Sequence, residues 1–206
     1  MEPPLYVALG DSTGVGVGAR SGGGYPERLQ KRLREDGHTL QLVNLCQSGA
    51  TTSDLIELQL PRAARTQPRL VTVGIGINDL GLQVPDEAFA LGLEEIAVSV
   101  ARLGAPVALL NLPDLSLSPT VSRLVPVSIY ERRVQLFNLH LTATAARHHF
   151  LLIDLYRLSR EVLPGRHSLF SPDGFHPSAE GYEVWAERMF EPVRALLRGE
   201  PAFTNA

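Results

Sequence analysis

The sequence predicts an α/β protein in which a parallel sheet lies between layers of helices. Short apolar runs alternate with longer segments of helical periodicity along the chain, and this alternation is typical of parallel sheets with helical crossovers. Some runs are apolar throughout, as expected for strands that are buried on both faces. Because 206 residues suffice for one well-buried domain and are few for two, we predict one domain over residues 1–199 and a tail over residues 200–206.

The first strand is predicted from Leu5, and its apolar run stops abruptly at Gly10, Asp11 and Ser12. It would deliver Ser12 to the carboxyl edge of the sheet, where open α/β sheets bind their ligands. Residues 13–24 are rich in glycine and are predicted to form a mobile loop, either a solvated linker or a flexible wall of the substrate pocket.

Helices and strands then alternate as far as a fourth strand. Thr52 or Ser53 is expected to cap the second helix, and Pro61 is expected to end it. The longest helix of this part carries its apolar side chains at spacings of three and four, which places them on one face. The predicted elements are a helix over residues 25–35, a strand over 40–45, a helix to residue 60, a strand over 70–75, a helix over 86–103 and a strand over 106–110.

The last part of the chain begins with a proline-containing loop over residues 111–125. Its leucines and valines either form an apolar wall beside the site or pack on the core. A helix over residues 126–149, a strand over residues 150–154 and a loop through Ser171 follow. The closing helix, over residues 178–197, is expected to bury Tyr182, Trp185, Met189 and Val193.

Ser12 is the candidate nucleophile, and a serine hydroxyl needs a base, a group that orients the base, and donors for the oxyanion. Asp173 lies three residues before His176 in a stretch broken by proline and glycine, so both side chains can turn toward one point. Gly49 and Asn78 follow two other apolar runs and offer a backbone N–H and a side-chain amide.

Each of these residues also has a purely structural interpretation. Ser12 fits a helix or turn cap, Asp173 fits a cap of the last helix, and Asn78 fits a turn. Asp11 and Asp79 are predicted to stabilise turns and to take no part in catalysis. The joint pattern, in contrast, favours catalysis, because unrelated capping roles would not reproduce the block order of the known family that the chain resembles.

At these residues the chain resembles an SGNH hydrolase of the GDSL esterase and lipase family. The resemblance implies the flavodoxin-like strand order 2-1-3-4-5 in a three-layer α/β/α sandwich. It also implies ester hydrolysis by Ser12, Asp173 and His176, an oxyanion hole formed by Ser12, Gly49 and Asn78, and no cofactor or metal. Thr13 stands where the family name has leucine. The four matching blocks, in the family's order, are Gly10-Asp11-Ser12, Gly49, Gly76-Ile77-Asn78-Asp79 and Asp173-Gly174-Phe175-His176.

Residues 10–14 also fit the G-x-S-x-G elbow of α/β-hydrolases. That fold needs several strands before its elbow, and its acid and histidine leave different strands, whereas Ser12 follows the first predicted strand and Asp173 and His176 share one loop. Two further functions use the same fold: an acyltransferase that passes the acyl group to an alcohol, and a non-catalytic binding module. Acyl chain length and the leaving alcohol stay open.

Composition limits the partners. The net charge of −3 provides no basic field for nucleic acid. Cys46 is the only cysteine, which excludes an internal disulfide. The first residues lack the features of a secretion signal, and no apolar run approaches the roughly 20 residues that cross a bilayer. We therefore expect a cytoplasmic enzyme with a small-molecule acyl ester as substrate, no nucleic acid and no stable membrane insertion; the oligomeric state is undetermined.

Overall fold

The computed structural model describes residues 3–124 and 127–200. Its centre is a five-stranded sheet, and all neighbouring strands are parallel. The strand order β2-β1-β3-β4-β5 confirms the predicted order. The strands are β1 (Leu5–Gly10), β2 (Gln41–Asn44), β3 (Pro68–Gly74), β4 (Val107–Leu110) and β5 (Leu151–Ile153).

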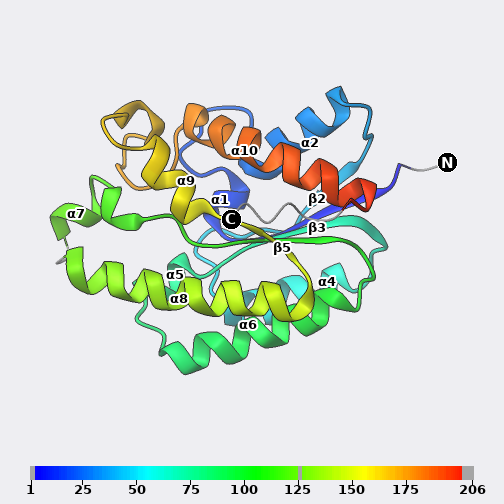
Figure 1. The fold of residues 1–206 in the computed structure, drawn as a ribbon, viewed down its shortest axis with the longest axis horizontal. Coiled ribbons are helices and arrows are strands. Elements are labelled where there is room, and N and C mark those ends of the chain that lie inside the picture. The colour runs from blue at the N-terminus through cyan, green and yellow to red at the C-terminus, as the bar shows by residue number, and fades with distance from the viewer. Residues whose placement is uncertain (1–2, 125–126, 201–206) are drawn as a thin grey trace.

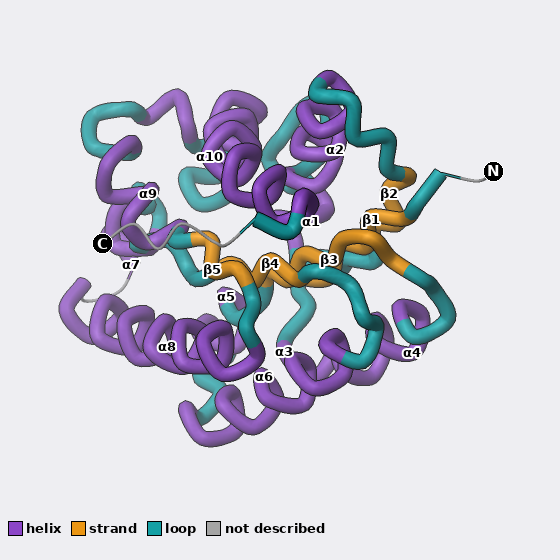
Figure 2. The backbone as a smooth tube through the Cα atoms, turned by 45° about the vertical axis from the view of Figure 1, so that its right-hand side comes forward, coloured by secondary structure: helices purple, strands orange, loops and turns teal. Residues whose placement is uncertain are grey.

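Helices cover both faces of the sheet (Figures 1 and 2), which confirms the three-layer arrangement. One layer contains α1 (Ser12–Val15), α2 (Tyr25–Glu35), α9 (Leu155–Val162) and α10 (Ala179–Arg198). The other contains α3 (Thr52–Asp54), the π-helical turn η1 (Leu55–Gln59), α4 (Leu60–Ala63), α5 (Ile77–Gly81), α6 (Asp86–Ala101) and α8 (Val127–His148). The short helices η2 (Leu115–Leu117), α7 (Val121–Leu124) and η3 (His167–Leu169) lie in connecting segments.

Each face of the sheet has its own apolar core, because successive side chains of a strand point to opposite faces. In β1, Tyr6 and Ala8 belong to the core beneath α2 and α10, whereas Val7 and Leu9 belong to the core beneath α6 and α8. The four α10 side chains predicted to be buried are buried. Among the described residues, no helix combines the length and the apolar character needed to cross a bilayer.

The register of the sheet aligns the carboxyl ends of its central strands. Gly10 at the end of β1 lies opposite Gly74 of β3, Gly74 lies opposite Leu110 of β4, and Leu110 lies opposite Ile153 of β5. The segments that leave these strands therefore start at one edge of the sheet.

Several segments predicted as loops contain helices, and α1 and α9 are two of them. Residues 12–15 form α1, and residues 155–162, expected to be loop, form α9. In each case an aspartate caps the first turn: Asp11 accepts the N–H of Thr13, and Asp154 accepts the N–H of Arg157. A side-chain cap of this kind satisfies an N–H group that has no partner within the helix.

The segment after β2 also differs from the prediction. Its cap is Thr51, which accepts the N–H of Asp54, and the helix does not end at Pro61. The wider turn η1 precedes Pro61, which then occupies the first turn of α4, where a missing N–H costs little. Some predicted segments lie partly outside the described residues. They are residues 201–206 of the predicted tail, residue 125 at the end of the predicted loop, and Pro126 at the start of the helix predicted over 126–149.

Candidate active site

Ser12 lies at the start of α1, directly beyond the end of β1. The turn that carries it is fixed by Asp11, whose Oδ1 accepts the Thr13 N–H at 2.9 Å and the Thr13 hydroxyl at 2.8 Å. Thr13, the departure from the family name, thus contributes an additional hydrogen bond to the turn. The Ser12 side chain is nearly buried, with 7% of the residue exposed.

Asp173 and His176 lie in a tight turn that is closed by its own backbone. Phe170 and Pro177 form an antiparallel bridge, and the Ser171 N–H donates to the His176 carbonyl at 2.8 Å. The His176 ring then faces the acid, with 2.7 Å between His176 Nδ1 and Asp173 Oδ2. The three-residue spacing of the acid and the histidine is therefore a property of this turn.

The second oxygen of Asp173 has three donors of its own. Oδ1 accepts the Ser171 hydroxyl at 2.7 Å, the Phe175 N–H at 2.8 Å and the His176 N–H at 2.9 Å. Partial burial alone would raise the pKa of Asp173, but the hydrogen bonds from His176, Phe175 and Ser171 outweigh it and hold this pKa well below its usual range. Asp173 is consequently a carboxylate at neutral pH.

The same turn places the second ring nitrogen of His176 against Ser12. His176 Nε2 lies 3.0 Å from Ser12 Oγ, within hydrogen-bond distance. Ser12, His176 and Asp173 thus form a continuous chain of hydrogen bonds, although 164 residues separate the serine from the histidine. A base in contact with a hydroxyl and oriented by a carboxylate has the geometry required to activate a nucleophile.

The two other predicted donors lie next to each other. Asn78, in the first turn of α5, donates one amide hydrogen to the Ala50 carbonyl at 2.9 Å, which fixes the amide beside Gly49 and leaves its second hydrogen free for another acceptor. Gly49 has φ +83°, a backbone conformation that glycine adopts without strain. Among the backbone hydrogen bonds in the described turns, loops and helix caps, none is donated by the N–H group of Ser12 or of Gly49.

Asp11 and Asp79 are both buried and hydrogen-bonded. Burial raises the pKa of Asp11 to about 6, although the bonds from Thr13 and the nearby His176 oppose the shift. Asp79 differs from its prediction as a local turn residue, because its carboxylate accepts the N–H of Thr52 at 3.1 Å and the Thr52 hydroxyl at 2.6 Å. It therefore connects the segment after β2 to the segment after β3.

The glycine-rich segment packs against the site, and its first residue, Thr13, lines the cavity described below. A Cβ on Gly18 would lie 2.6 Å from the Pro177 carbonyl oxygen and 2.9 Å from His176 Cβ. The segment therefore packs directly against the turn over residues 170–177, here called the acid–histidine turn. The hydroxyl of Tyr182 on α10 also donates to the Val17 carbonyl at 2.8 Å. The glycines allow a close approach between backbones.

A narrow apolar cavity opens beside His176, between the acid–histidine turn, α9, α10 and the loop after β4. The loop after β4 therefore fulfils both roles considered for it, because Leu112 is a core residue and Leu115 is buried while also lining the cavity. Residues that line the cavity include Leu115, Leu163, Phe175, His176, Val184 and Trp185.

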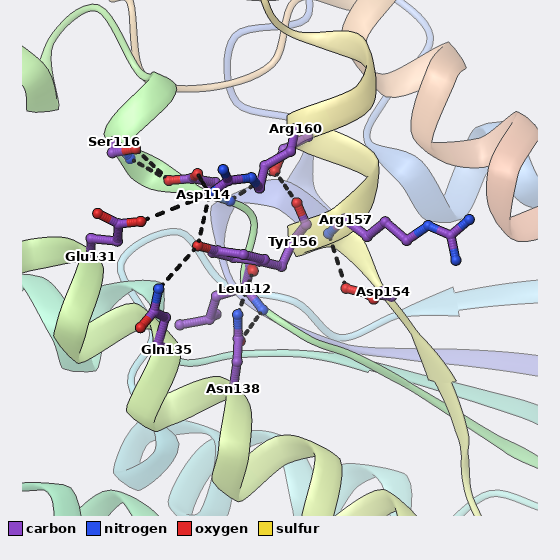
Figure 3. Close-up of polar contacts among 11 residues, drawn as sticks. Leu112, Asp114, Ser116, Glu131, Gln135, Asn138, Asp154, Tyr156, Arg157 and Arg160 are labelled. Atoms are coloured by element: carbon purple, nitrogen blue, oxygen red, sulfur yellow. Dashed lines mark hydrogen bonds and ion pairs between the residues drawn. The ribbon is translucent and has the colours of Figure 1, made fainter. Parts of the chain in front are cut away.

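A polar network holds the loop after β4 in place (Figure 3). Asn138 of α8 binds both the N–H and the carbonyl of Leu112, at 2.8 and 2.9 Å. The carboxylate of Asp114, which is 4% exposed, accepts a bond from Arg160 of α9 at 3.2 Å, and the Asp114 N–H donates to the Ser159 hydroxyl at 2.8 Å. The cavity wall is thus fastened to helices of both layers.

Sequence analysis assigned no role to several residues that support the site. Ser171 donates to the catalytic candidate Asp173. Gln59 is fully buried, and its amide binds both the N–H and the carbonyl of Gly10, each at 2.8 Å. Ser171 lies two residues before the predicted site residue Asp173 and was therefore detectable, whereas Gln59 is 49 residues from Gly10 and carries no comparable signal.

The chain matches a known protein family. Residues 8–184 match the model of the GDSL-like Lipase/Acylhydrolase family. The chain belongs to this family. Membership accounts for the positions of the four sequence blocks, and with the esterases among its relatives it makes the chain a carboxylic ester hydrolase.

Several relatives of this GDSL hydrolase are esterases. Esterase TesA of Pseudomonas aeruginosa is 24% identical over 191 residues, which are 93% of this chain and 88% of TesA. A crystal structure of TesA, 25% identical, superposes with a TM-score of 0.77 over 93% of this chain and 99% of that chain. The psychrotrophic esterase EstA from Pseudoalteromonas sp. has the same fold, with a TM-score of 0.75 at 19% identity over 94% of this chain and 98% of EstA.

Proposed function

We propose that this hydrolase cleaves carboxylic esters in two steps through an acyl-enzyme formed on Ser12. The observation that carries the proposal is the unbroken chain of hydrogen bonds from Ser12 Oγ through His176 to Asp173. His176 takes the hydroxyl proton as Ser12 Oγ attacks the ester carbonyl, and it returns this proton to the leaving alcohol. In the second step His176 takes a proton from water as the water oxygen attacks the acyl carbon, and it returns this proton to Ser12 Oγ when the bond between Oγ and the acyl carbon breaks and the acid is released.

Asp173 has two tasks in this scheme. Its bond to Nδ1 holds the imidazole in the tautomer that leaves Nε2 free to accept the serine proton, and its negative charge stabilises the imidazolium that forms. The low pKa of Asp173 supports both tasks, since the carboxylate stays ionised at any pH at which the histidine can act as a base.

The negative charge on the carbonyl oxygen requires donors that are already in position. We assign them to the backbone N–H groups of Ser12 and Gly49 and to the second amide hydrogen of Asn78. The bond from Asn78 to the Ala50 carbonyl supports this assignment because it fixes the amide beside Gly49. The acyl chain is assigned to the apolar cavity beside His176.

Hydrolysis of p-nitrophenyl esters with acyl chains of two to sixteen carbons tests the proposal. Wild type is expected to turn over part of the series and to react with a serine-directed fluorophosphonate, whereas Ser12→Ala is expected to do neither. Ser53→Ala, which removes an exposed hydroxyl on α3, is the matched control. Wild-type turnover by Ser12→Ala would refute the proposed nucleophile.

Transfer of the acyl group to an alcohol other than water would use the same residues and differs only in the second acceptor. Added alcohols distinguish the two reactions. Hydrolysis predominates if free acid remains the main product, and acyl transfer predominates if a new ester accumulates at low alcohol concentration.

A further inference from the structure

The end of the loop after β4 contacts the acid–histidine turn through three hydrogen bonds. The Ser118 hydroxyl donates to the Gly174 carbonyl at 2.8 Å, and the Thr120 N–H donates to the same carbonyl at 3.2 Å. The Thr120 hydroxyl donates to the carbonyl of Asp173 itself at 2.6 Å. Two consecutive carbonyl groups of the turn, starting at the acid, are thus held by one neighbouring segment.

Gly174 shows how closely this segment approaches. Its φ of +67° lies in the left-handed region, and a Cβ at this position would lie 2.8 Å from Thr120 Oγ1. A side chain at residue 174 would therefore strain the turn and displace Thr120. Glycine is required here both by the backbone conformation and by the contact with Thr120.

The bonds within the turn do not by themselves fix its position relative to Ser12. They hold Asp173 against His176, but both residues belong to one short segment, and Asp173 lies at the surface with 45% of its side chain exposed. The position of the whole turn depends on its neighbours, which include the segment around Gly18, the start of α10 at Gly181 and residues 118–120.

We infer that Ser118 and Thr120 are positioning residues for the Asp173–His176 pair. They act through the carbonyl groups of Asp173 and Gly174 and touch no reacting atom. Because Ser118 also lines the apolar cavity, the same segment links the wall of that cavity to the base. The inference rests on the proposed function, in which His176 takes the proton of Ser12.

Removal of the Thr120 hydroxyl tests the inference. Thr120→Val keeps the shape of the side chain and deletes the donor to Asp173, and Thr120→Ser keeps the donor. Loss of one such bond in the transition state is expected to lower kcat about fivefold to tenfold with little change in KM. Thr120→Ser should recover at least half of the wild-type kcat.

Ser122→Ala is the control within the same segment. The Ser122 hydroxyl donates to the Pro119 carbonyl at 3.2 Å at the surface and has no bond to the turn, so its kcat should equal that of wild type. Equal melting temperatures of Thr120→Val and Ser122→Ala would show that any difference in kcat does not come from unfolding. If Thr120→Val is markedly less stable, the comparison is made with Ser118→Ala at a temperature where both variants are folded.

The pH profile separates positioning of the acid from a general disturbance. A displaced Asp173 stabilises the imidazolium less, so the pH at which kcat/KM reaches half of its maximum should fall in Thr120→Val, in the same direction as in Asp173→Asn. In the Asp173→Asn background, Thr120→Val should lower kcat less than twofold, because its effect passes through the acid.

Equal losses in both backgrounds, or wild-type kcat and pH dependence in Thr120→Val, would overturn the inference. These results would leave the proposed function intact, because that function is tested by Ser12→Ala in the same assay. Turnover by Ser12→Ala, in contrast, would refute the proposed nucleophile whatever the Thr120 variants do.

Discussion

The proposed role of Asn78 can be separated from the fold, because Asp79 keeps its bonds from Thr52 and still connects α5 to the segment after β2 when the bond from Asn78 to Ala50 is lost. Removing one oxyanion donor costs on the order of 3 kcal/mol in the transition state. Asn78→Ala should therefore lower kcat about a hundredfold or more, while the lost bond to the Ala50 carbonyl should cost only about 1 kcal/mol of unfolding free energy. Asn78→Asp should lose more, since a carboxylate would repel the developing charge. Wild-type turnover by Asn78→Ala would remove this residue from the mechanism.

Asp11 makes the stability of the fold depend on pH. Burial raises its pKa from 3.8 to about 6, so the folded state favours the protonated acid. The stability that this preference provides is complete below about pH 4 and is lost as the pH rises through about 6.

Asp11→Asn mimics the protonated acid and should remove this dependence. Relative to wild type, the variant should gain about 2 kcal/mol of unfolding free energy between about pH 4.5 and pH 8. Urea unfolding of both proteins at the two pH values measures the gain, and the contribution of Asp173 cancels because both proteins contain it. A difference that does not change with pH would contradict the prediction.

Among the elements that carry no predicted site residue, the π-helical turn η1 is hydrogen-bonded to the strand end that precedes the nucleophile. It directs Gln59 to Gly10, two residues before Ser12, where the amide binds both backbone groups at 2.8 Å. The Gly10 carbonyl has a second donor in the Gln47 N–H at 3.0 Å, but its N–H depends on Gln59. The turn η1 thus supports the end of β1 from the layer that contains α6 and α8.

Gln59→Leu should therefore leave a buried N–H without an acceptor. We expect a loss of about 2 kcal/mol in unfolding free energy and a lower kcat, because the segment that carries Ser12 loses a support. Gln135→Leu, which removes an exposed amide on α8, should change stability by less than about 0.5 kcal/mol. Urea unfolding and kcat measurements on both variants provide the comparison, and equal stability of the two would refute the role of Gln59.

In the whole molecule, the apolar cavity forms where the last third of the chain meets the loop after β4, with Thr13 and Ile77 completing its lining. A larger side chain in its wall should shorten the acyl chains that fit. Val184→Phe is expected to lower kcat/KM for the longest p-nitrophenyl esters most and to leave the shortest ones nearly unchanged.

Leu196→Phe is the control for that change, since Leu196 lies on the same helix and packs on the core away from the cavity. Its chain-length preference should match that of wild type. If Val184→Phe lowers kcat/KM equally for all chain lengths, the acyl chain lies elsewhere.

The sequence by itself determined the fold class, the strand order through the family resemblance, and the residues that form the candidate site. Apolar runs such as that of β1 are local signals, because a strand buried on both faces must be apolar along its length. Residues that the chemistry requires at strand ends, such as Ser12 and Asn78, are also recognisable from the sequence. Their residue types and their order along the chain can be read without any knowledge of packing.

The tertiary structure alone decided which groups support that site. Gln59 reaches Gly10 because η1 packs against β1, and Thr120 reaches Asp173 because two segments from distant parts of the chain meet beside the site. Such contacts leave no periodicity in the sequence. A single hydrogen bond between distant residues constrains only the two side chains or backbone groups that form it, whereas burial of a strand constrains every residue along its length.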